Sequence, residues 1–387
     1  MNLTRTAYGT WNGGRYMNFG EMLDEAHFDS AIQYAYQKGI RTFMTADVYG
    51  SGAADEALGR ALAGIPRDSY CLVGMIGHDF YGGARDGQKG FPRFTDSRLR
   101  QPSEFAEYVR MATERQLERL RTDRLDCLML HNPDQIGYSH DAVWTAMARM
   151  QEEKMTDLLG VAPGPANGFT LDLLLCYERF HSLLDWAMVI LNPFEPWPGQ
   201  MALDAAANYQ IDLITRVADY GGLFHGDVRP GHTFGTRDHR TFRPAGWVEA
   251  GSAKIDRIRH IAEKHNLTLL QLSCIWNLSQ SPVKSVVPTL IQEVAQTNGI
   301  TAKTIEAKIE DLAAMPDITL SADEIAHLTD IGQNKNCMEL KGGNPAYIGE
   351  PLPDRWSLNS DLLAVADRWK IQPAEDLVCT HKAAAVA

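Results

Sequence analysis

Residues 125–134 read LDCLMLHNPD, a largely apolar run of strand length that ends in His131 and three further polar or turn-forming residues. A strand that is apolar at successive positions is buried on both faces, which is typical of parallel sheets. The polar residues then fall just after the strand, where parallel α/β proteins place their functional groups. This stretch therefore predicts a buried parallel strand that delivers His131 to the functional edge of a sheet.

Similar apolar runs lie on both sides of this stretch, and amphipathic helix patterns separate them. One such helix places Phe28, Ala31, Ile32 and Ala35 on a single face. The alternation predicts an α/β fold, a closed (β/α)8 TIM barrel whose active site lies on the loops after the strands. The predicted strands are residues 7–10, 42–45, 71–75, 125–130, 158–161, 188–191, 212–217 and 284–288.

Two loops and a tail exceed what a minimal barrel needs. Residues 78–101 follow the third predicted strand, and residues 225–251 follow the seventh. Loops of this length in a compact domain are usually either functional lids or disordered. We expect the barrel to span residues 1–333 and a C-terminal extension, residues 334–387, to pack on it.

The composition is that of an acidic globular protein with a large core. The 387 residues include 37 Lys and Arg against 49 Asp and Glu, for a net charge of -12, so nucleic acid is not an expected partner. The six cysteines show no CxxC pair, and no signal peptide or membrane span is apparent. We expect a cytoplasmic protein with a small-molecule substrate and no membrane partner, and a homo-oligomer stays open.

Three runs together suggest a family. They are TADVYGSGAADEALGRAL (residues 45–62), LDCLMLHNPD (125–134), and ADYGGLFHGD (218–227) followed by RDHR (237–240). They resemble the aldo-keto reductase superfamily, which implies a (β/α)8 oxidoreductase that reduces carbonyls with NADP or NAD. Of that family's catalytic Asp, Tyr, Lys and His, the resemblance carries over Tyr49 and His131, whereas Met44 and Met75 stand at the Asp and Lys positions.

The missing Asp and Lys change the chemistry that we expect. A phenol with an ordinary pKa of about 10 needs a nearby cation to exchange protons at neutral pH. Two thioethers would instead exclude water and hold Tyr49 as a neutral hydrogen-bond donor. The sequence therefore predicts an apolar rather than an ionic pocket around Tyr49 and His131.

Other residues are expected to contact the substrate because of their places in the predicted barrel. Three tryptophans, Trp11, Trp197 and Trp247, lie at predicted loop positions on the catalytic side, where aromatic faces often stack on sugar rings, although anchoring of the loops is an equal alternative. A histidine opens the loop after the third strand, and the two methionines named above flank the pocket. The predicted substrate-binding residues are Trp11, His78, Met44, Met75 and Trp197.

The resemblance also implies changes at the nucleotide-binding positions. Ala162 and Pro163 replace the usual Ser-Asn pair after the fifth strand, and Met188 replaces a Gln on the sixth. After the eighth strand, Lys303 or Lys308 could take over the contact to the adenosine phosphate. The cofactor-binding positions that are kept are Asn192, Arg216, Gly222 and Leu223.

The second long loop carries a cluster of charged residues. Arg237, Asp238, Arg240 and Arg243 are expected to form an internal salt-bridge network, and an anionic or polyhydroxylated substrate is the alternative partner. The loop histidines match no metal-binding spacing, so no metal site is predicted.

Three functions stay open. The first is NAD(P)-linked oxidoreduction of a carbonyl or carbohydrate-like compound. The second is a redox-neutral lyase, hydratase or epimerase reaction in the same pocket, with His131 or His78 as the base and Tyr49 as the donor. The third is a non-catalytic binding subunit that has kept the barrel.

Overall fold

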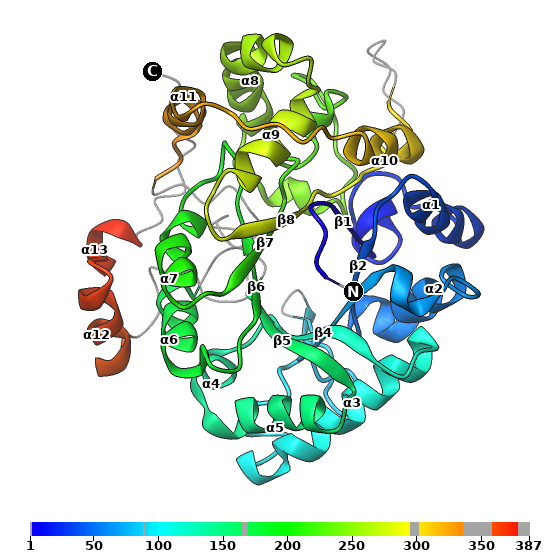
Figure 1. Cartoon of the computed structure of the whole chain (residues 1–387), viewed down its shortest axis with the longest axis vertical. Coiled ribbons are helices and arrows are strands. Elements are labelled where there is room, and N and C mark those ends of the chain that lie inside the picture. Colours follow the sequence, from blue (N-terminus) through cyan, green and yellow to red (C-terminus); the bar gives the residue numbers. More distant parts are fainter. Residues whose placement is uncertain (1, 88–89, 165–168, 295–301, 336–357, 378–387) are drawn as a thin grey trace.

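The computed structural model describes residues 2–87, 90–164, 169–294, 302–335 and 358–377. Parallel strands form one sheet in which each strand is hydrogen-bonded to the next along the chain. The ring closes where Thr6 pairs in parallel with Val286, and Figure 1 shows it as a barrel with helices outside. The strands are β1 (Ala7–Gly9), β2 (Thr42–Ala46), β3 (Cys71–Ile76), β4 (Leu125–His131), β5 (Thr156–Ala162), β6 (Trp186–Ile190), β7 (Asp212–Arg216) and β8 (Val283–Val287).

Helices cover the outside of the ring and generally follow the strands in turn (Figure 1). Their inner faces are apolar, as in α1, where Phe28, Ala31, Ile32 and Ala35 are buried. The helices of the described residues are α1 (Glu25–Gln37), α2 (Ala53–Ala61), α3 (Phe105–Leu120), α4 (Gln135–Ser139), α5 (Asp141–Glu152), α6 (Thr170–Phe180), α7 (Leu203–Asn208), α8 (Trp247–Lys264), α9 (Leu269–Leu278), α10 (Ile305–Ala313), α11 (Ala322–Gly332), α12 (Ser360–Arg368) and α13 (Pro373–Asp376).

The strands divide the buried residues into two layers. In β3, Cys71, Val73 and Met75 point into the barrel, whereas Leu72 and Ile76 pack against the outer helices. Side chains thus fill the barrel as a core and leave no pore. Methionines from four strands help to fill this irregular space: Met44, Met75, Met129 and Met188.

The predicted (β/α)8 barrel is confirmed. Each predicted strand agrees with an observed strand to within two residues at either end. The agreement follows from the burial of both strand faces, which makes each strand visible as an apolar run. None of the described helices is long and apolar enough to cross a membrane.

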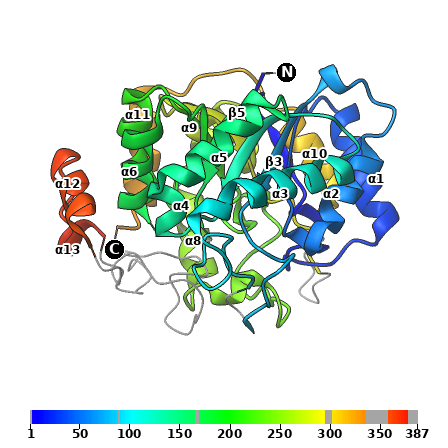
Figure 2. The same ribbon diagram turned by 90° about the horizontal axis from the view of Figure 1, so that it is seen from below.

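Part of the C-terminal extension packs on the outer wall of the barrel. Figures 1 and 2 both show α12 and α13 outside the ring, next to α6. The Trp369 indole N–H and Arg368 Nε each donate to Glu178 Oε1 of α6, at 2.9 Å in both cases. Residues 336–357 and 378–387 lie outside the described residues, so the domain boundary at residue 334 stays a prediction.

Candidate active site

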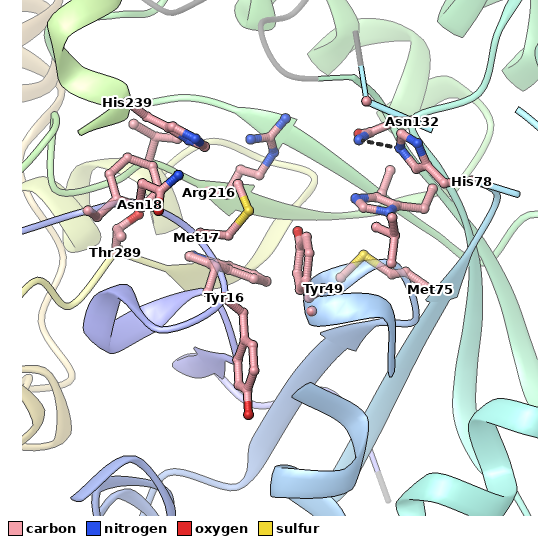
Figure 3. Close-up of a pocket in the computed structure, with 18 of the residues that line it drawn as sticks. Tyr16, Met17, Asn18, Tyr49, Met75, His78, Asn132, Arg216, His239 and Thr289 are labelled. Carbon is pink, nitrogen blue, oxygen red and sulfur yellow. Dashed lines mark hydrogen bonds between the residues drawn. The ribbon is translucent and has the colours of Figure 1, made fainter. Parts of the chain in front are cut away.

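The carboxyl ends of the strands surround a cavity of about 470 Å³, a volume typical of small-molecule sites. Its walls come from strand ends and from the two long loops, and Figure 3 shows many of the side chains that line it. The structure brings six of the predicted site residues together here. They are Trp11, Tyr49, Met75, His78, His131 and Arg216.

A tight turn after β2 positions Tyr49. It begins the 3-10 turn Tyr49–Gly52, in which Gly50 and Ser51 have positive φ angles of 61° and 53°. The chain therefore bends sharply, and the Tyr49 ring stands in the cavity (Figure 3). Burial raises the pKa of the phenol to about 12, although the Arg216 cation opposes this shift. Tyr49 thus stays protonated at neutral pH and can donate a hydrogen bond.

His131 is the last residue of β4 and lies edge-on to Tyr49, with the two ring centroids 5.5 Å apart. Its side chain is 5% exposed. Burial, together with the Arg93 and Arg216 cations, lowers the pKa of His131 to about 3. The two predicted catalytic side chains therefore meet as a neutral phenol and a neutral imidazole.

Contacts on both nitrogens fix the ring of His78. His78 Nδ1 lies 3.0 Å from Arg93 Nη1 and 3.2 Å from the Phe91 carbonyl oxygen. Nε2 lies 3.1 Å from the side-chain amide of Asn132 (Figure 3). Burial and the Arg93 cation hold the pKa of His78 well below its usual range. Contacts on both nitrogens therefore orient His78 beside Asn132, and its role as a base stays a prediction.

The expectation of an apolar pocket is also wrong. Met75 lines the wall of the cavity, but Met44 lies deeper in the barrel. Met44 is the strand partner of Val73, two residues before the pair that Ala46 and Met75 form. Met44 thus belongs to the barrel core and does not line the cavity. Two guanidinium groups, of Arg93 and Arg216, face the same space as Tyr49 and His131. The surroundings of the two rings are therefore cationic.

Arg216 ends β7 and reaches across to the loop after β5. Its Nη2 donates to the carbonyl oxygens of Pro163, at 3.2 Å, and Gly164, at 2.8 Å. The side chain points into the cavity (Figure 3). Two backbone carbonyls thus hold the guanidinium in place while part of it still faces the cavity.

Two residues predicted to bind ligand are structural instead. Trp197 is 2% exposed, and its indole N–H donates to the Asp376 carbonyl at 2.7 Å, so it anchors α13 to the barrel. Asn192 uses both ends of its amide locally. Nδ2 donates to Glu195 and to the Val217 carbonyl, and Oδ1 accepts from two backbone N–H groups of its own turn. Neither side chain lines the cavity.

The two remaining cofactor positions lie behind the cavity wall. Leu223 is fully buried in the outer core. Gly222 has a φ of 97°, and a Cβ there would lie 3.1 Å from Glu293, so the position has little room for a side chain. The neighbouring Gly221 lines the cavity in its place.

The predicted network in the second long loop is confirmed for three of its four members. Arg240 pairs with Asp238 at 2.7 Å and with Glu293 at 2.6 Å, and Arg243 pairs with Glu195 at 3.0 Å. All these side chains are nearly fully buried. The network therefore fixes the loop that forms one wall of the cavity.

The proposed role of Lys308 toward an adenosine phosphate is wrong. Its side chain is fully buried, pairs with Asp227 at 2.7 Å and donates to the Ile291 carbonyl at 2.5 Å. A lysine held in this way cannot reach a ligand. Lys308 instead ties α10 to the loop after β7.

Sequence reasoning missed several cavity residues, above all Arg93 and Asp219. Asp219 Oδ1 accepts the Thr289 backbone N–H at 2.7 Å, while Oδ2 is buried with no partner among the described residues. Burial raises the pKa of Asp219. The only signal in the sequence was the polar composition of the two loops, which does not say which residue turns inward. In the described part of the chain, no three His, Cys, Asp or Glu side chains gather as metal ligands.

Comparisons with known proteins agree with this fold. The chain is 24% identical over 330 residues to versiconal hemiacetal acetate reductase of Aspergillus parasiticus, covering 80% of this chain and 88% of the relative. Glycerol dehydrogenase from Gluconobacter oxydans has the same fold, with a TM-score of 0.66 at 23% identity over 86% of this chain and 92% of that one. An aldo/keto reductase from Klebsiella pneumoniae, solved with NADP and acetate, gives a TM-score of 0.57 at 20% identity over 87% and 94%.

The family comparison covers nearly all of the barrel. The model of the aldo/keto reductase family matches residues 6–331, which run from β1 through α11 and include both Tyr49 and His131. The chain belongs to the aldo/keto reductase family.

Proposed function

We propose that this protein is an NAD(P)-linked oxidoreductase that acts on the carbonyl or alcohol group of a small, carbohydrate-like molecule. The observation that carries the proposal is the pair formed by Tyr49 and His131, two neutral hydrogen-bond donors whose ring centroids lie 5.5 Å apart in one cavity. Family membership, and relatives that include a reductase and a glycerol dehydrogenase, support the same reaction class.

The side chains suit the reduction of a carbonyl. The Tyr49 hydroxyl donates to the carbonyl oxygen and can pass it a proton as negative charge develops there, and the N–H of the neutral His131 ring is a second donor. Arg93 stabilises the charge on that oxygen, because a fixed cation in an enclosed site interacts strongly with it. Its guanidinium thus takes over part of the role expected of the missing Lys.

The wall on the β7 and β8 side suits a nucleotide. The unpartnered Asp219 Oδ2 can accept a ribose hydroxyl, and Gly221 lets a ligand approach the backbone closely. Thr289 and Ile291 line the same wall. A bound nicotinamide would supply or accept the hydride. The Klebsiella pneumoniae relative solved with NADP supports this assignment, and NAD stays open.

The redox-neutral alternative receives less support from the site. Elimination or epimerisation next to a carbonyl needs a base whose pKa lies near the working pH. The pKa of His131 is lowered to about 3 and that of His78 lies well below its usual range. Neither ring holds a proton well enough to serve, whereas the neutral His131 ring can orient a carbonyl.

The test begins with nucleotide binding. NADH and NADPH are titrated into the purified protein while nucleotide fluorescence is followed, and a panel of aldoses, ketoses and their alcohols is then assayed. We expect a saturable rise in emission and turnover that falls by about 10²–10⁴ in Tyr49→Phe. His131→Asn should lower turnover as well.

Tyr138→Phe is the matched control, because it removes the hydroxyl of a fully buried tyrosine that does not line the cavity. It should leave turnover unchanged. Absence of nucleotide binding at millimolar concentration would contradict the proposal and favour the redox-neutral alternative. Turnover that is equal in wild type, Tyr49→Phe and His131→Asn would remove the assignment of the catalytic pair.

A further inference from the structure

The cavity is strongly cationic although the protein as a whole is acidic. The chain has a net charge of -12. Six arginines nevertheless line the cavity, and Asp219 is the one acidic residue among the described lining residues. Such a concentration of one sign in a concave site attracts ligands of the opposite charge. The lining arginines are Arg15, Arg85, Arg93, Arg216, Arg240 and Arg243.

These arginines differ in how well the protein neutralises them. Arg240 and Arg243 form buried pairs with Glu293 and Glu195, so they serve to hold the wall. Arg216 has no carboxylate partner among the described residues, and its hydrogen bonds go to two backbone carbonyls. An enclosed cation without a counter-charge is costly, which makes an anion supplied by the ligand the natural partner.

The position of Arg216 indicates which ligand supplies that anion. Figure 3 shows its guanidinium in the same part of the cavity toward which the Tyr49 hydroxyl points. Arg216 also interacts electrostatically with both Tyr49 and His131. A group bound to Arg216 therefore lies in the same part of the cavity as the oxygen that those two residues hold. The phosphates of a dinucleotide are separated from the nicotinamide ring by a ribose, so a substrate group fits this place better.

We infer that Arg216 is a carboxylate-binding subsite and that the substrate is an acid, such as a sugar acid, whose reacting oxygen meets Tyr49 and His131. This inference rests on the proposed function only in calling the ligand a substrate. The two carbonyls occupy Nη2 and leave Nη1 of this guanidinium to donate to a carboxylate oxygen in a charge-assisted hydrogen bond. Neutral sugars would leave this cation unpaired.

The experiment compares acids with matched neutral sugars. Binding of D-glucuronate and D-glucose, and of D-galacturonate and D-galactose, is measured by calorimetry on the full chain. Wild type, Arg216→Met, Arg216→Lys and Arg85→Met are compared. Arg85→Met is the control, because it removes the same charge from an exposed residue at the rim of the cavity.

We expect wild type to bind the acids at least about tenfold more tightly than the neutral sugars. Arg216→Met should lose this preference without weaker binding of the neutral sugars, Arg216→Lys should keep part of it, and Arg85→Met should keep nearly all of it. Lys retains the charge but not the planar guanidinium that the two carbonyls hold in place, so partial rescue would separate recognition of a carboxylate from a defect in folding.

Three outcomes would overturn the inference. The first is equal binding of acids and neutral sugars by wild type, which includes no binding of either. The second is an acid preference that survives in Arg216→Met. The third is a selective loss of NADH and NADPH binding in that variant. The last outcome would mean that Arg216 meets a nucleotide phosphate. An acid preference in a protein that binds no nucleotide would instead refute the proposed oxidoreductase and leave the subsite standing.

Discussion

Gly9, at the end of β1, lacks a side chain because Trp11 occupies the space where one would stand. A Cβ at residue 9 would lie 2.4 Å from the Trp11 ring, and that indole in turn lies edge-on to Tyr49 with the centroids 6.3 Å apart. Gly9→Ala should therefore displace the indole from Tyr49 and lower the free energy of unfolding by about 1–3 kcal/mol. Urea unfolding and the emission of Trp11, isolated by comparison with Trp11→Phe, measure the two effects.

Gly235→Ala provides the control for this prediction. Gly235 is exposed, and a Cβ there would meet nothing within 4 Å. Its substitution should change the free energy of unfolding by no more than about 0.5 kcal/mol. If Gly9→Ala shows the same stability and tryptophan emission as this control, the packing of Trp11 does not depend on residue 9.

The residues that sequence reasoning placed correctly share one property. Tyr49, Met75 and His131 each lie on or just after an apolar run, so the fold alone carries them to the cavity. Asn192 also follows a strand, yet its amide is consumed by its own turn, as asparagine side chains often are. Arg93 comes from a loop that folds back over the barrel mouth, and no local pattern encodes that path.

At the scale of elements, one carboxylate holds the start of the loop after β3. Asp79 is fully buried and accepts from Arg100 Nη2 at 2.5 Å and from the backbone N–H groups of Tyr81 and Gly82. Asp79→Ala leaves Arg100 without its buried partner, a change that costs about 3–5 kcal/mol in comparable pairs. We expect faster hydrogen exchange throughout this loop, measured by mass spectrometry, and a lower urea midpoint.

A surface pair in the same loop separates this effect from simple loss of charge. Arg98 pairs with Asp96 at 2.5 Å, but the Arg98 side chain is 84% exposed. Exposed pairs contribute about 0–1 kcal/mol, so Arg98→Ala should leave exchange and stability nearly unchanged. Equal exchange in the two variants would mean that Asp79 does not hold the loop.

The elements were predictable to different degrees for a physical reason. Strands buried on both faces must be apolar throughout, so their positions follow from the sequence to within two residues. The two long loops were located correctly, but long-range contacts set their paths. Asp238 in the second loop illustrates this, because its carboxylate accepts the backbone N–H of Gly20, 218 residues away in the chain.

For the molecule as a whole, buried imidazoles link stability to pH. Burial lowers the pKa values of His78, His131 and His225, that of His131 to about 3. In the unfolded chain a histidine has a pKa of about 6.5. Below that pH the unfolded state binds protons that the native state does not, so stability present above about pH 6.5 is lost as the pH falls toward 3. At pH 5 the His131 ring accounts for a loss of about 2 kcal/mol.

Some buried carboxyl groups act in the opposite direction, so the prediction must isolate one ring. Burial raises the pKa of Asp55 to about 6, which means that its contribution to stability increases as the pH falls. The quantity to measure is therefore the loss of unfolding free energy between pH 7.5 and pH 5 in wild type and in His131→Asn, by urea titration. The variant should lose about 2 kcal/mol less than wild type, whereas the buried control Tyr138→Phe should lose as much as wild type. Equal losses in wild type and His131→Asn would mean that His131 is protonated in the native state at pH 5. Such an imidazolium beside Arg93 and Arg216 would contradict the neutral pair of Tyr49 and His131 on which the site depends.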